Sequence, residues 1–205
     1  MRMTIYASDD KNIPPYAILS HTWGHKDDEI YMKDIEDNNF RRKAASRKFL
    51  FCSERAEKDG LQYFWIDTCC IDQGKYTVEL TTAINSMFKW YKNAAKCYVY
   101  LSDVPRINNT PSSKSPAPHP RPWESAFRAS RWFTRGWTLQ ELLAPRIVEF
   151  ISSDGVKLGD KAELEELIHQ ITGIDTSALR GSDLSNFSFE KRMSWMEGRQ
   201  TKVEE

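Results

Sequence analysis

The residues best suited to chemistry in this sequence follow three short apolar runs. Ser20-His21-Thr22-Trp23-Gly24 follows the first run, Asp67-Thr68-Cys69-Cys70-Ile71-Asp72-Gln73 the second, and Ser102-Asp103 the third. If these runs are parallel strands of one sheet, their carboxyl ends share an edge, and ligands of open α/β sheets bind there. Hydroxyl, imidazole, carboxylate and indole groups at that edge favour a polar pocket for a small molecule.

A further carboxylate, Glu141, lies in the segment Trp137-Thr138-Leu139-Gln140-Glu141-Leu142. The segment has helical character, so Trp137 and Glu141 are one turn apart and can share a face. Leucines flank Glu141, which predicts that its side chain is partly buried. A buried carboxylate must be paired, hydrogen-bonded, or functional with a raised pKa. The structural alternative is an ion pair with one of three nearby arginines, Arg131, Arg135 or Arg146.

The residues at the first two strand ends offer two possible nucleophilic sites. Ser20, His21 and Asp67 are the residue types of a hydrolase triad, but the sequence has no Gly-x-Ser-x-Gly elbow. Cys69 or Cys70 with His21 could form a thiol nucleophile and its base. Adjacent residues of an extended segment point to opposite faces, so at most one thiol could serve. The alternative for both cysteines is packing as small hydrophobic residues.

A metal site is not expected. His21 and His25 precede Asp27, Asp28 and Glu29, but Gly24 interrupts the pattern and no Cys-x-x-Cys or His-Glu-x-x-His motif completes it. The sequence also lacks a Gly-x-Gly-x-x-Gly or Walker loop, so it does not support a Rossmann dinucleotide site or a nucleoside triphosphate site. We therefore expect no resident cofactor.

The elements that must position these residues alternate between strand and helix. Apolar runs predict strands at 16–20, 63–67, 97–101 and 147–151, and helical spacing predicts helices at 40–59, 80–91, 123–144 and 160–172. The helix at 123–144 is interrupted near residues 134–136. Near-continuous apolar strands that alternate with helices predict a parallel sheet of about four to five strands with helices on both faces.

Composition excludes several classes of protein. The chain has 205 residues, of which 40% are hydrophobic and 12% aromatic, so it is not intrinsically disordered. Its 29 basic and 29 acidic residues balance, which argues against a dedicated nucleic-acid binder. No apolar run reaches the length of a membrane span, and the N-terminus has no apolar signal core. Four cysteines without a signal indicate reduced thiols, so we expect a cytoplasmic protein.

Taken together, the motifs resemble a known family. The blocks are Tyr16 to Gly24, Phe64 to Gln73, Ala83 to Phe88 with Tyr91 and Ala94, and Arg131 to Glu141. Their order and spacing over residues 14–151 resemble the fungal heterokaryon incompatibility (HET) domain. The chain departs from the pattern at Thr82, where family members commonly carry Glu.

The resemblance implies a role in fungal nonself recognition, in which the domain executes programmed cell death when a partner region releases or clusters it. HET domains are regarded as distant relatives of TIR domains, which implies a flavodoxin-like sheet. In TIR enzymes that cleave NAD, the catalytic glutamate lies in a Trp-Cys-x-x-Glu block, which Trp137 to Glu141 resembles except at Thr138, where Cys is usual. The resemblance implies that Glu141 is catalytic and that NAD is a substrate. The residues expected to bind the NAD are chosen mostly by their position at the strand ends: Ser20, His21, Trp23, Asp67, Asp72, Arg131, Arg135 and Trp137.

The alternative that the resemblance leaves open is a non-catalytic module that signals by self-association. In either case we expect a regulatory partner or partner domain. We expect residues 1–155 to form the HET domain, with a Pro-rich loop at 105–122, and residues 156–205 to form a C-terminal helical extension. The segment Lys191 to Trp195 resembles the region C-terminal to the domain in larger family members, so we expect the chain to be part of a longer protein.

Overall fold

The computed structural model describes residues 12–71, 78–105 and 121–200 of the chain. Its centre is a five-stranded sheet in the order β2-β1-β3-β4-β5. The strands are β1 Tyr16–His21, β2 Tyr63–Trp65, β3 Lys96–Tyr100, β4 Val148–Ile151 and β5 Lys157–Asp160. The first four are mutually parallel and β5 runs antiparallel to β4. This is the flavodoxin-like strand order, so the predicted α/β fold is confirmed.

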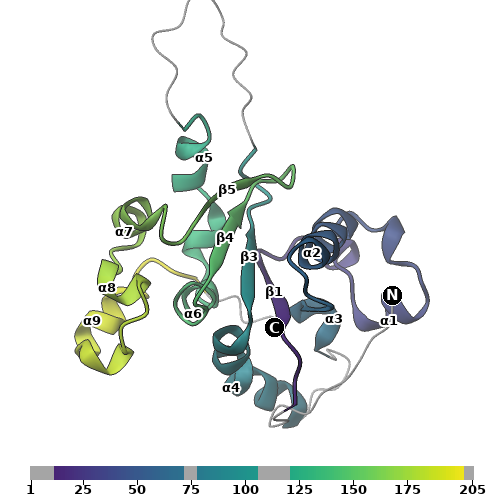
Figure 1. Cartoon of the computed structure of the whole chain (residues 1–205), viewed down its shortest axis with the longest axis horizontal. Coiled ribbons are helices and arrows are strands. Elements are labelled where there is room, and N and C mark those ends of the chain that lie inside the picture. Colours follow the sequence, from purple (N-terminus) through teal and green to yellow (C-terminus); the bar gives the residue numbers. More distant parts are fainter. Residues whose placement is uncertain (1–11, 72–77, 106–120, 201–205) are drawn as a thin grey trace, which may run out of the picture.

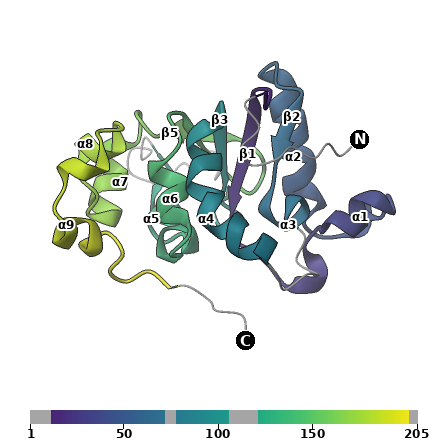
Figure 2. The ribbon, with the colours of Figure 1, turned by 90° about the horizontal axis from the view of Figure 1, so that it is seen from below.

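Helices connect the strands and cover the sheet. They are α1 Met32–Glu36, α2 Ser46–Lys58, α3 Asp67–Cys70, α4 Val78–Asn93, α5 Glu124–Arg128, α6 Thr138–Leu143, α7 Glu165–Thr172, α8 Thr176–Leu179 and α9 Phe189–Ser194. In Figure 1, α2 and α3 lie to the right of β1, and α5 and α6 lie to the left of β3. Figure 2 shows α7, α8 and α9 grouped at the β5 end of the molecule, far from α1. No helix of the described residues is long and apolar enough to cross a membrane.

The alternation of side chains along β1 separates two hydrophobic cores. Ile18 belongs to the core formed with α4 to α8, whereas Ala17 and Leu19 belong to the core formed with α2 and α3. Successive strand residues point to opposite faces, so Ser20 continues the face of Ile18 and His21 continues the face of Leu19. Ser20 and His21, the first polar residues after the apolar run, therefore lie on opposite faces of the sheet.

Several elements differ from the sequence prediction, three of them near the site or the sheet edge. The second strand ends at Trp65 because Asp67 begins α3, where its side chain accepts a hydrogen bond from the Thr68 amide at 2.7 Å. The helix expected at 40–59 begins as a short 3-10 turn at Phe40–Arg42, and α2 begins only at Ser46. Strand β5 was not placed by the sequence, and it extends the sheet past residue 155. Residues 106–120 of the predicted Pro-rich loop lie outside the described residues.

Candidate active site

Glu141 lies on α6 against the carboxyl end of β1. Glu141 is 4% exposed, and its Oε2 accepts a hydrogen bond from the Ser20 hydroxyl. The Trp132 indole N–H donates to the same Ser20 oxygen at 2.7 Å. An indole nitrogen can only donate, so Ser20 must accept from Trp132, and its own proton is left for Glu141. The burial expected from the flanking leucines is found, and no arginine of the described residues forms an ion pair with Glu141.

Tyr91 of α4 completes this cluster and indicates which protonation state fits it. The Tyr91 hydroxyl donates to the Leu19 carbonyl at 3.1 Å and also hydrogen-bonds the Glu141 carboxyl. A phenol has one proton to donate. Since Leu19 receives that proton, a hydrogen bond between Tyr91 and Glu141 in this arrangement is one that a protonated Glu141 donates. A neutral Glu141 therefore satisfies every hydrogen bond of the cluster.

The electrostatics agree with a neutral acid. Burial raises the pKa of Glu141 to about 8, and the nearby charge of Asp67 acts in the same direction. The hydrogen bond from Ser20 and the charge of Arg135 lower the pKa, but they do not outweigh the loss of solvent. At neutral pH the Glu141 carboxyl is therefore mostly protonated in this closed arrangement.

On the other face of β1, His21 lies between two carboxylates. Its Nε2 is 3.7 Å from Glu29 Oε2 and its Nδ1 is 3.8 Å from Asp67 Oδ1. The His21 residue is 7% exposed and both ring nitrogens lack a hydrogen bond. Trp23 joins the cluster because its indole N–H donates to Asp67 Oδ2 at 2.7 Å. The structure thus brings His21, Asp67 and Trp23 together as the sequence predicts.

Glu29 is the buried partner that the sequence did not single out as a binding residue. Glu29 is 2% exposed. Its Oε1 accepts hydrogen bonds from the Lys48 ammonium and the Gly24 amide, each at 2.6 Å. Burial alone would raise the pKa of Glu29. The charges of His21 and Lys48 and the hydrogen bond from the Gly24 amide overcome that effect and lower the pKa to about 2. Glu29 is consequently ionised at neutral pH.

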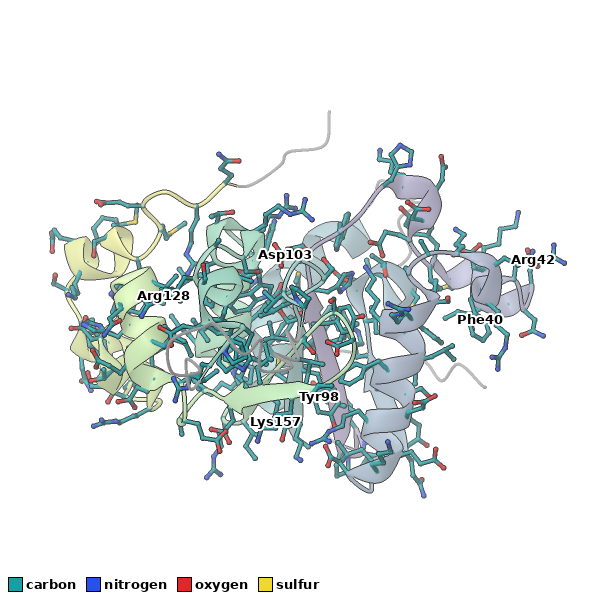
Figure 3. The ribbon with its side chains drawn as sticks, turned by 90° about the horizontal axis from the view of Figure 1, so that it is seen from above. Phe40, Arg42, Tyr98, Asp103, Arg128 and Lys157 are labelled. Carbon is teal, nitrogen blue, oxygen red and sulfur yellow. The ribbon has the colours of Figure 1, made fainter. Side chains whose placement is uncertain are left out.

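The turn before α6 is fixed to the end of β3 by Asp103. Its Oδ1 accepts from the Ser130 hydroxyl at 2.8 Å and its Oδ2 from the Arg131 amide at 2.9 Å. Figure 3 shows Asp103 near the middle of the molecule, well away from Phe40 and Arg42. β1 and β3 flank the point at which the strand order reverses, which is the usual ligand position in a flavodoxin-like sheet. Ser20, Asp103 and Glu141 therefore converge on the expected edge.

The remaining predicted site residues do not enter this cluster. Arg131 is exposed, and its Nε lies 3.8 Å from Asp103 Oδ2. Trp137 is 37% exposed, so it does not share the buried environment of Glu141. Arg135 is close enough for its charge to act on Glu141. Asp72 lies outside the described residues.

Neither Cys69 nor the surface groove takes part in these two clusters. Cys69 is buried and its thiol donates to the Ile66 carbonyl at 3.7 Å, which fits packing as a small residue. A groove of about 620 Å³ lies between α2 and the β4–β5 hairpin, and none of the predicted site residues lines it. Within the described residues, no three His, Cys, Asp or Glu side chains are arranged to hold a metal ion.

Comparisons with known proteins decide the family. The family model described as heterokaryon incompatibility protein (HET) matches residues 16–114. The vegetative incompatibility protein HET-E-1 of Podospora anserina is 52% identical over 193 residues, which cover 94% of this chain and 14% of that protein. The chain belongs to the heterokaryon incompatibility family. No solved structure matches this HET chain significantly, and it spans only about a seventh of the length of its curated relative.

The HET family match contains Ser20, His21, Trp23 and Asp67, whereas Glu141 lies beyond its last matched residue. Sequence reasoning missed Tyr91, Trp132 and Glu29 as members of the site. Tyr91 and Trp132 occur in the blocks that resemble the HET domain, so the motif itself was a signal, but both also fit an apolar core. For Glu29 the local sequence is a run of charged residues, which gives no sign that one of them is buried.

Proposed function

We propose that this chain is a cell-death effector of fungal nonself recognition that hydrolyses NAD at the nicotinamide–ribose bond when it is clustered. Membership of the HET family and the incompatibility protein of Podospora anserina support the first part. The observation that carries the second part is the position of Glu141, a buried carboxyl at the end of β1, where the strand order reverses between β1 and β3. Its block also resembles the glutamate block of TIR enzymes that cleave NAD.

The reaction needs one well-placed carboxylate and no general acid. Water and NAD give ADP-ribose, nicotinamide and a proton. When the bond between ribose C1′ and the pyridinium nitrogen breaks, its electron pair goes to that nitrogen, so nicotinamide leaves as a neutral molecule. The ribose is left with oxocarbenium character, as in glycosidases. An ionised Glu141 would accept hydrogen bonds from the ribose hydroxyls and stabilise the developing positive charge.

The closed site must open before this chemistry can occur. Glu141 is 4% exposed and held by Ser20, so a ribose can reach it only if α6 or the loop after β1 moves. We propose that clustering causes this movement, and that solvation of Glu141 in the open site lowers its pKa and ionises it. In the open site Ser20, His21, Trp23, Asp67, Asp72, Arg131, Arg135 and Trp137 would contact the nucleotide, with the arginines on the phosphates.

The test is nicotinamide release by purified protein fused to an inducible clustering domain. Glu141→Gln should abolish release while the far-ultraviolet circular dichroism is unchanged, and Glu36→Gln on the exposed face of α1 is the matched control with wild-type release. Continued release from clustered Glu141→Gln protein would show that Glu141 is not the catalytic residue.

A second candidate is the non-catalytic, self-associating module. Two observations favour it: the occlusion of Glu141, and an exposed apolar face formed by Phe189, Met193 and Met196, which are 65%, 45% and 47% exposed. These residues recur at helical spacing at the C-terminal end of the described chain. This candidate predicts concentration-dependent assembly and toxicity that Glu141→Gln leaves intact and that Phe189→Ser with Met193→Ser removes.

A further inference from the structure

The C-terminal segment of the described chain is bonded to the turn that precedes α6. The Gln200 amide donates to the Thr134 carbonyl at 2.7 Å, and the Gly136 amide donates to the Gln200 carbonyl at 2.9 Å. These bonds form an isolated parallel bridge between Arg135 and Gln200. Figure 1 shows this segment leaving α9 in yellow and crossing to α6. Backbone hydrogen bonds thus connect residues that are more than 60 positions apart in the sequence.

Arg199 reinforces the bridge with its side chain. Its Nε donates to the Trp195 carbonyl at 3.0 Å, and its Nη1 donates to the Arg135 carbonyl and to Thr138 Oγ1, each at 3.1 Å. Burial lowers the pKa of Arg199 to about 10, so the guanidinium is still charged at neutral pH. No carboxylate of the described residues lies within ion-pair distance. Arg199 gives up solvent to bind three neutral oxygens, so its role is to fix the positions of these oxygens. Among basic side chains, only the arginine fork can reach all three.

The oxygens that Arg199 holds lead directly to Glu141. Thr138 Oγ1 is also 2.7 Å from the Trp132 carbonyl, to which it can donate. Trp132 in turn donates to Ser20, which donates to Glu141. Thr138 lies one helical turn before Glu141 on α6. One connected set of hydrogen bonds therefore joins the guanidinium of Arg199 to the candidate catalytic carboxyl.

We propose that Arg199 is a positioning residue for the active site, which locks the Trp132–Thr138 turn so that Trp132 and Glu141 meet at Ser20. The role rests on the proposed function, because it matters to catalysis only if Glu141 is catalytic. It also assigns a task in the site to a residue far beyond the segment 16–114 that the family model matches. Displacement of residues 199–200 would loosen the turn and admit solvent to Glu141.

The primary test does not need activity. In Arg199→Met, amide hydrogen exchange across residues 132–142 should accelerate at least tenfold. The pKa of Glu141, followed through the infrared band of its protonated carboxyl, should fall from about 8 toward its usual value of 4.5. The groups facing that carboxyl, Asp67 on α3, Tyr91 on α4, Cys97 on β3 and Arg135 on the turn, are unchanged in the variant. Arg192→Met on the exposed surface of α9 is the matched control.

Arg199→Lys keeps the charge and one or two hydrogen bonds, so it should fold even where Arg199→Met does not, with an intermediate acceleration of exchange and an intermediate pKa. In the turnover assay on clustered protein, in which the site is already open, Arg199→Met should lower kcat roughly 10- to 100-fold with little change in KM, because misplaced catalytic groups slow the chemical step. Exchange rates and a Glu141 pKa equal to those of wild type in folded Arg199 variants would overturn the proposal. Absence of turnover in wild type, with the exchange and pKa effects present, would overturn only the enzymatic function.

Discussion

Replacing Glu141 by Gln should make the stability of the protein less dependent on pH. Gln is the neutral counterpart of a protonated Glu: its carbonyl can accept from Ser20 and its amide can donate to Tyr91. The folded-state pKa of about 8 lies above the usual value of 4.5. The folded state therefore holds the proton more tightly than the unfolded state, so stability from this group is present below pH 4.5 and is lost as the pH rises to 8.

The size of the effect follows from the two pKa values. At about 1.4 kcal/mol per pH unit, the interval between 4.5 and about 8 corresponds to roughly 5 kcal/mol, of which about 4 kcal/mol falls between pH 5 and pH 9. The free energy of unfolding of wild type should therefore fall, relative to that of Glu141→Gln, by this amount across that range. For a domain whose total stability is on the order of 5–15 kcal/mol, the difference is easily measured.

The assay is urea unfolding of both proteins at half-unit steps from pH 5 to pH 9, followed by tryptophan fluorescence. All other titrating groups are shared, so they cancel in the difference between the two proteins. Glu36→Gln should run parallel to wild type, because Glu36 is exposed. A difference between Glu141→Gln and wild type that does not change with pH would refute the assignment of Glu141 as a neutral buried acid.

Three further predictions concern Glu29, Ser20 and Cys70. Glu29→Gln should destabilise the protein by roughly 3 kcal/mol at pH 7, because its pKa of about 2 lies below the usual 4.5, and the loss should vanish as the pH falls through 4.5 toward 2, as urea unfolding in acid would show. Ser20→Ala should cost about 1–3 kcal/mol, since Trp132 Nε1 and Glu141 Oε2 lose their partner, and should raise the Glu141 pKa in the infrared titration. Cys70→Ser should leave nicotinamide release from clustered protein unchanged, because the proposed reaction uses no thiol; loss of release in a folded variant would favour the cysteine enzyme.

The strands were predictable because buried parallel strands are continuous apolar runs. Tyr16 to Leu19 and Cys97 to Leu101 have this form, and the structure places β1 and β3 there. The burial of Glu141 was also predictable, because leucines flank it on an otherwise apolar helix. Both inferences use information that is local in the sequence.

What could not be predicted depends on partners that are distant in the sequence. Strand β5 carries no apolar run, and it exists because it pairs with β4 through the backbone. Its Gly159 lets Leu164 approach, since a Cβ there would lie 2.9 Å from the leucine Cγ. Glu29 is buried with Lys48, 19 residues later, which supplies the opposite charge. Trp132 reaches Ser20 across 112 residues, and a core tryptophan was the equally good interpretation.

The central claim, that Glu141 is the carboxylate that stabilises the ribosyl centre, is tested most directly by the pH dependence of kcat/KM for nicotinamide release from clustered protein. This parameter reports the free enzyme, in which Glu141 has a pKa of about 8 when closed. The account predicts that kcat/KM rises with pH and levels off at or below pH 8, and that no such rise remains in Glu141→Gln. A profile that falls as the pH rises from 5 to 9, or that is the same in both proteins, would contradict it.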